Sequence, residues 1–106
     1  KERIRIKNMT TNKLFEGERL TLTLSGRLDT NSSPALEAEL KQSVGGVKEL
    51  IFDFSGVEYI SSAGLRVLLA AQKVMNRQGS MKLIGVNDDV MEVFEITGFS
   101  DILTIE

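Results

Sequence analysis

Two adjacent serines, Ser61 and Ser62, are the residues of this sequence best placed to take part in chemistry. They open a stretch with helical periodicity that runs to about Gln78, and Gly64 lies in its first turn. The first turn of a helix leaves backbone N–H groups without partners and carries the positive end of the helix dipole, so it favours an anion. A phosphate on one of these hydroxyls would therefore disturb the fold little.

A serine at a helix start is also an ordinary N-cap, which contributes about 1 kcal/mol to stability. Two features argue for more than a cap in this sequence. One serine is enough for capping, and Gly64 costs up to about 1 kcal/mol of helix propensity relative to alanine, without an evident structural return. We expect the close approach of a partner or a phosphate to be the reason for this glycine.

Histidine and cysteine are both absent from the sequence. Their absence excludes disulfides, thiol nucleophiles, zinc sites built from Cys and His, and every Ser-His-Asp arrangement. Carboxylates such as Asp29 and Asp53 remain, but no base is placed beside a nucleophile. The sequence therefore predicts a binding protein that has no catalytic residues, no metal and no cofactor.

The charge balance bears on the partners of the protein. Thirteen Lys and Arg residues against fifteen Asp and Glu residues give a net charge of −2, which offers no general attraction to nucleic acid. The apolar stretches are far shorter than the roughly 20 residues needed to cross a bilayer. We therefore expect a cytoplasmic protein that binds neither nucleic acid nor membrane.

The pattern of apolar and turn residues predicts the elements that hold these serines. Strands are expected in an N-terminal edge hairpin and at 20–25, 49–54, 81–84 and 102–105. The predicted helices begin at Pro34 with Ser33 as N-cap, at Ser62 after a connection spanning 55–61, and just after Asn87, which caps the last helix.

This order predicts an α/β fold with a single mixed sheet of about five strands. The first edge strand is antiparallel and the others are parallel, joined by right-handed helical crossovers, and residues 1–106 form one domain. The carboxyl ends of the parallel strands then meet at one rim, where sites in such sheets usually lie. Asp29 follows the first of these strands, and its carboxylate serves either a backbone turn or a partner contact, with no preference between the two.

Three segments resemble the STAS domain, the fold of bacterial anti-sigma-factor antagonists. Residues 53–69 (DFSGVEYISSAGLRVLL) match its central signature, which is the most specific part of the likeness. Gly26–Asp29 matches the G-x-L-D motif before the first helix, and 94–99 (FEITGF) matches the closing helix and glycine. The resemblance spans nearly the whole chain, and the family's order of strands and helices agrees with the order given above.

The resemblance implies a binding protein controlled by phosphorylation. The unphosphorylated antagonist binds an anti-sigma factor that is also a serine kinase and so frees the sigma factor. Phosphorylation of the antagonist by this kinase switches it off, and a PP2C-type phosphatase restores the unphosphorylated form. Alignment on the shared Gly-Leu pair places the phosphoacceptor at Ser62. Family members commonly carry Asp where this chain has Ser61, and Ser or Thr where it has Ala63, so Ser61 is the second choice.

The partner-binding rim is expected to contain six residues drawn from three segments of the chain. They are Asp29, Thr30, Ser61, Gly64, Arg66 and Asn87. The alternative is a STAS module that is not phosphorylated and that binds partners, or a nucleotide or other anion, at the same helix start. An enzyme that uses the carboxylates of the rim is the least favoured hypothesis.

Overall fold

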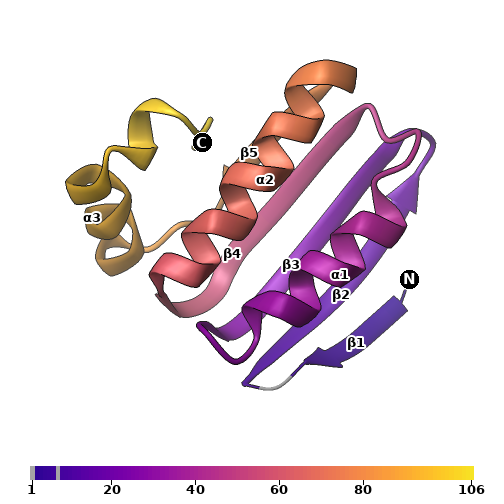
Figure 1. Cartoon of the computed structure of the whole chain (residues 1–106). Coiled ribbons are helices and arrows are strands. Elements are labelled where there is room, and N and C mark those ends of the chain that lie inside the picture. The colour runs from indigo at the N-terminus through magenta and orange to yellow at the C-terminus, as the bar shows by residue number, and fades with distance from the viewer. Residues whose placement is uncertain (1, 7) are drawn as a thin grey trace.

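The computed structural model describes residues 2–6 and 8–106, which form a five-stranded sheet and three α-helices (Figure 1). The elements are β1 (Glu2–Ile6), β2 (Met9–Glu16), β3 (Arg19–Leu28), α1 (Ser33–Ser43), β4 (Glu49–Ile60), α2 (Ser62–Gln78), β5 (Ser80–Ile84), α3 (Asp88–Thr97) and the short 3₁₀ helix η1 (Phe99–Asp101). The strands lie side by side in the same order as they follow one another along the chain.

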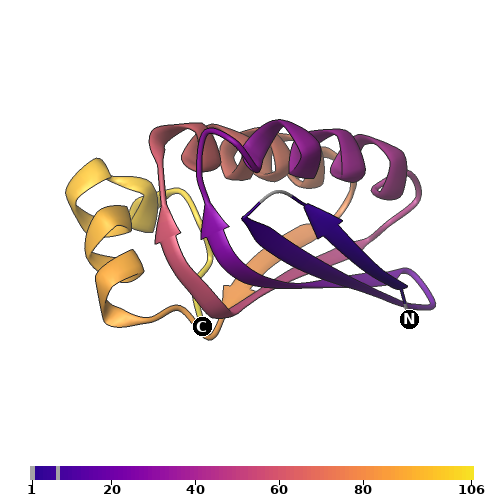
Figure 2. The same ribbon diagram turned by 90° about the horizontal axis from the view of Figure 1, so that it is seen from below.

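The sheet combines antiparallel and parallel pairing. β1 and β2 are antiparallel, as are β2 and β3, whereas β3, β4 and β5 are mutually parallel. A short turn joins β2 to β3, and the helices α1 and α2 cross over between the parallel strands. Both crossover helices cover the same face of the sheet, and α3 lies outside this helix layer (Figure 2). The predicted α/β fold with a single mixed sheet of five strands is therefore confirmed. The prediction that only the first strand is antiparallel is wrong, because both β1–β2 and β2–β3 are antiparallel pairs.

The hydrophobic core lies between the sheet and the α1/α2 layer. Leu20, Leu22 and Leu24 of β3 are fully buried, while the residues between them are more exposed. This alternation is the period-two pattern that predicted the strand. In the middle of the sheet, Leu22 pairs with Phe52 of β4, and Phe52 pairs with Leu83 of β5. All three side chains have no exposed surface, so the core continues across the parallel strands.

β3 and β4 extend well beyond their predicted ends. Most of the connection predicted at 55–61 belongs to β4, which continues to Ile60, and β3 continues to Leu28. The register of this strand pair shifts twice, between Thr23 and Ser25 and between Gly26 and Arg27, near and beyond the predicted end of β3. Because a bulge breaks the alternation of buried and exposed side chains, a period-two pattern does not reveal the last part of either strand. The rim therefore lies farther along these two strands than predicted.

The strand predicted at 102–105 is wrong. This segment makes one isolated parallel bridge, between Ile105 and Leu83. Its apolar residues are nevertheless used, because Leu103 is buried and Ile105 packs against the core. The fifth strand comes instead from the N-terminal hairpin, which contributes both β1 and β2.

Candidate functional site

The candidate site lies where β3 and β4 end and α2 begins. Leu28 and Ile60 are the last paired residues of the two strands. The backbone N–H of Ser61 then donates to the carbonyl oxygen of Leu28, 2.9 Å away, and α2 begins at Ser62. The chain after β3 brings Thr30 to this helix start, where it lines a hollow together with Ala63 and Arg66. Two segments about 30 residues apart in sequence are therefore joined at one rim.

The two serines occupy different positions at the start of α2. Ser61 is the N-cap, with an extended backbone, and its Oγ accepts from the N–H of Gly64 at 3.4 Å. Ser62 is the first residue of the helix and is exposed. Among the hydrogen bonds of the described residues, none involves the Ser62 hydroxyl. The hydroxyl of Ser62 is thus the one left accessible, while that of Ser61 has a structural role.

The environment of Ser62 is favourable for negative charge. The first turn of α2 carries no acidic side chain of its own that would offset the positive end of the helix dipole. The N–H of Leu65 bonds to the carbonyl of Ser61 and that of Gly64 to the Ser61 hydroxyl. Two earlier N–H groups, those of Ser62 and Ala63, have no partner among the described residues.

A glycine is needed at position 64 because α2 packs tightly on the sheet there. The expectation that the close approach of a partner or a phosphate explains this glycine is therefore wrong. The residue is buried, and a Cβ placed on it would lie 2.8 Å from side-chain carbons of Leu28 and Ile60 and 2.9 Å from the carbonyl oxygen of Leu28. The glycine therefore lets α2 pack directly on the ends of β3 and β4. It is no longer an argument for a bound phosphate, and its buried backbone offers little surface to a partner.

This packing leads to a prediction for Gly64→Ala. Overpacking a tight site usually costs about 1–3 kcal/mol, and the gain in helix propensity returns at most about 1 kcal/mol. We expect a net loss of about 1–2 kcal/mol in the free energy of unfolding, measured by urea denaturation. Gly45→Ala is the matched control, because a Cβ there meets nothing within 4 Å. Equal stability of the two variants would contradict the packing argument.

Asp29 holds the turn between β3 and α1. Its Oδ1 accepts from the backbone N–H groups of Asn31 at 3.0 Å and Ser32 at 3.1 Å, and its Oδ2 lies 3.6 Å from Nε of Arg27. Burial alone would raise the pKa of this carboxyl, but the hydrogen bonds from Ser32 and Asn31, together with Arg27, outweigh it and lower the pKa overall. Of the two roles that the sequence left open, the structure shows the turn.

The start of α1 differs from the prediction. Ser32, not Ser33, is the N-cap, and it makes no side-chain capping bond to the helix. Its hydroxyl instead donates to the carbonyl of Arg27 at 2.7 Å. Of the two N–H groups that an N-cap side chain usually binds, Pro34 supplies none, and the hydroxyl of Ser32 accepts from the backbone N–H of Asp29 at 3.0 Å instead. The sequence pattern of a serine before Pro34 could not separate these two arrangements.

Asn87 lies at the other end of the predicted rim, and both polar atoms of its amide make a hydrogen bond within the domain. Its Oδ1 accepts from the N–H of Val90 at 2.8 Å, which confirms the predicted cap of α3. Its Nδ2 donates to the carbonyl of Val57 in β4, also at 2.8 Å. The second bond ties α3 to the extended part of β4, so a role of Asn87 in partner binding stays a prediction.

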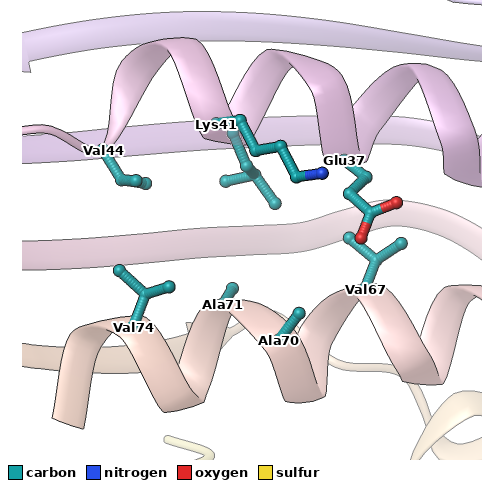
Figure 3. A pocket seen from close by; sticks show the side chains of 8 residues that line it. Glu37, Lys41, Val44, Val67, Ala70, Ala71 and Val74 are labelled. Atoms are coloured by element: carbon teal, nitrogen blue, oxygen red, sulfur yellow. The ribbon is translucent and has the colours of Figure 1, made fainter. Parts of the chain in front are cut away.

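A hollow between the starts of α1 and α2 lies beside Ser62. Its lining consists of Thr30, Ser33, Pro34, Glu37, Ala63, Arg66 and Val67. Arg66 and Glu37 are its only charged groups among these lining residues, one of each sign. The hollow continues along the seam between the two helices into a mainly apolar groove, in which side chains of α1 and α2 face each other (Figure 3). Glu37 and Val67 belong to both.

Two features of the rim have no local signal in the sequence and were not predicted from it. Glu37 has no motif around it, and only the packing of α1 beside α2 brings it opposite Arg66. Arg27 and Tyr59 form the second feature, because the guanidinium carbon lies 4.2 Å from the centre of the exposed ring. These two residues are paired in register across β3 and β4 only because both strands extend past their predicted ends.

Neither a metal site nor a membrane span is found in residues 2–6 and 8–106. No group of three or more acidic side chains in this part of the chain is arranged to hold a metal ion. No helix in it has the length and apolar character that spanning a bilayer requires.

Three comparisons with known proteins bear on this site. Residues 8–106 match the sequence profile of the STAS domain. BtrV of Bordetella bronchiseptica is 40% identical in an alignment 88 positions long, which covers 81% of this chain and 76% of that protein. The anti-sigma-B factor antagonist of Listeria monocytogenes is 34% identical in an alignment 93 positions long, which covers 84% of this chain and 80% of that protein. The structure of the Bacillus cell fate determinant SpoIIAA in its phosphorylated form shares the fold, with a TM-score of 0.72 and 18% identity over 91% of this chain and 90% of that one.

Proposed function

Because the chain belongs to the STAS domain family, we propose that it is an anti-sigma-factor antagonist that is switched by phosphorylation of Ser62. In its unphosphorylated form it binds an anti-sigma factor that is also a serine kinase, and so releases a sigma factor. A PP2C-type phosphatase reverses the modification, and the exchange takes place in the cytoplasm. The observation that carries the proposal is the exposed hydroxyl of Ser62 at the first position of α2, beside a capping Ser61 whose hydroxyl is engaged.

The chemistry requires little of this chain. The kinase transfers the γ-phosphoryl group of ATP to Oγ of Ser62, so that a new P–O bond forms while the bond to the β–γ bridging oxygen breaks. ADP leaves, and the hydroxyl proton passes to a base of the kinase. The phosphatase adds water to the phosphorus and releases inorganic phosphate. A chain without histidine or cysteine is sufficient for this role, because both partners supply the catalytic groups.

The position of Ser62 explains how such a switch would spare the fold. A phosphoserine carries a charge of about −1.5 to −2 at pH 7. At the start of α2 this charge meets free backbone N–H groups and the helix dipole, so it stabilises the helix rather than breaking it. In a partner interface the same charge is costly, because it must lose water or face other acidic groups. Phosphorylation is therefore expected to weaken the partner contact while the domain stays folded.

The test of the acceptor is intact-mass measurement after incubation with the cognate kinase and ATP. We expect one phosphate on the wild-type chain and none on Ser62→Ala. Ser61→Ala is the matched control, since it removes the neighbouring hydroxyl and a helix cap worth about 1 kcal/mol. It should still accept one phosphate. A phosphate that persists in Ser62→Ala and disappears in Ser61→Ala would reverse our assignment.

A further inference from the structure

We propose that Arg66 binds the phosphate on Ser62 and that this contact draws Arg66 out of the hollow between α1 and α2. The inference rests on the proposed function, because it takes Ser62 as the phosphoacceptor. Arg66 follows Ser62 by four residues on α2, and residues four apart lie on the same face of a helix, about 5–6 Å apart at their Cβ atoms. Both residues are exposed, so neither side chain has to leave the core to make the contact.

The guanidinium of Arg66 is not committed elsewhere. The ion pairs of the described residues use Lys13, Arg19, Arg27 and Lys82, and none of them includes Arg66. Glu37 lines the same hollow, but no ion pair between it and Arg66 is formed within 4.0 Å. A new anion on the adjacent helical turn would therefore find a cation that loses no existing salt bridge.

The other cations of α2 are too distant for this role. Lys73 follows Ser62 by 11 residues, which corresponds to about 16 Å at a rise of about 1.5 Å per residue. Arg77 lies a further turn along the helix. Of the basic side chains on α2, Arg66 alone is thus within reach, and its planar guanidinium suits the oxygens of a phosphate.

The contact would change the partner surface in two ways. The phosphate itself adds negative charge at the rim. In addition, the hollow loses its positive group, because the guanidinium turns toward the phosphate and leaves Glu37 as the charge that remains. A surface with balanced charges in the unphosphorylated state would become acidic along the start of the α1/α2 seam. The modification would then be sensed over a wider area than a single side chain.

The test introduces phosphoserine at position 62 during translation, so that it needs no kinase, and follows the phosphate by ³¹P NMR as pH varies. The second pKa of phosphoserine is about 6, and a nearby cation lowers it by favouring the dianion. Relative to the otherwise unchanged phosphoprotein, we expect Arg66→Gln to raise this pKa by about 0.3 units or more. Lys73→Gln, which removes the same charge farther along the helix, should shift it much less.

Salt provides a second arm of the same experiment. The difference between Arg66→Gln and the parent should shrink at 1 M salt, where the screening length is about 3 Å, if the contact is an ion pair on the surface. An Arg66→Gln shift no larger than that of Lys73→Gln would overturn the inference and leave the choice of Ser62 untouched. Failure of the kinase to modify Ser62 in the mass measurement would instead overturn the proposed function.

Discussion

Replacing Ser62 with aspartate is expected to weaken binding to the cognate anti-sigma factor at least about 100-fold, which corresponds to about 2.7 kcal/mol. The side chain is exposed at the first position of α2, where a carboxylate is favourable for the isolated domain. In the complex the same carboxylate would be desolvated without a partner, and a buried unpaired charge typically costs about 2–5 kcal/mol. Binding should therefore fall while stability stays the same or rises slightly. Titration calorimetry for affinity and urea denaturation for stability measure the two effects separately.

Ser80→Asp is the matched control for this change. Ser80 is also an exposed serine, but it opens β5, at the end of the parallel strands opposite the rim. Ser80→Asp adds the same charge as Ser62→Asp. It should leave the affinity for the partner within about twofold of the wild-type value, because charges that are far from an interface are screened. If Ser62→Asp unfolds the domain, the hydroxyl has a structural role that the geometry does not show. If both variants bind equally well, the rim at Ser62 is not the partner surface.

The sequence predicted the elements best where one face is buried throughout. The alternation of Leu20, Leu22 and Leu24 with polar residues predicts a strand with one buried face, and all three leucines are buried in the structure. Asn87 was also identified as a cap, since its amide acts on backbone only three residues away. Both signals are local, so neighbouring residues alone determine them. The ends of β3 and β4 depend on a bulged pairing between distant segments, which no local pattern encodes.

The same distinction applies to the candidate site. The position of Ser62 on the first turn of α2 follows from local periodicity and was predicted correctly. The role of Gly64 was not, because its reason lies in Leu28 and Ile60, which reach it only through the packing of α2 on two strand ends. Glu37 was missed for a similar reason, as α1 and α2 meet only in the folded chain. Helix propensity gives the energetic cost of a glycine in a helix, but it does not show that Leu28 and Ile60 occupy the place of the missing side chain.

Phe94→Ala is expected to lower the free energy of unfolding by about 3–5 kcal/mol, more than Gly64→Ala. Phe94 has no exposed surface and packs against Phe54 of β4, with the ring centres 6.2 Å apart and the planes tilted by 50°. Phe54 in turn meets Phe52 edge to face at 6.3 Å. The three rings connect α3 to the middle of the sheet, and removing the outermost one leaves a cavity in an aromatic cluster. Urea denaturation gives the change in free energy.

Ile96→Ala is the control on the same helix, two residues later. Ile96 is 78% exposed, so its truncation removes almost no buried surface and should change the free energy of unfolding by less than about 0.5 kcal/mol. Should Phe94→Ala prove too unstable to measure, Phe94→Leu keeps most of the volume and should lose about 1–1.5 kcal/mol. A similar, small effect of the Phe94 and Ile96 variants would mean that α3 is held mainly by the Asn87 contact with Val57. We expect Phe94→Ala to be far more destabilising than Ile96→Ala. One hydrogen bond contributes only about 0.5–1.5 kcal/mol, well below the free energy that is lost when a buried phenylalanine is truncated to alanine.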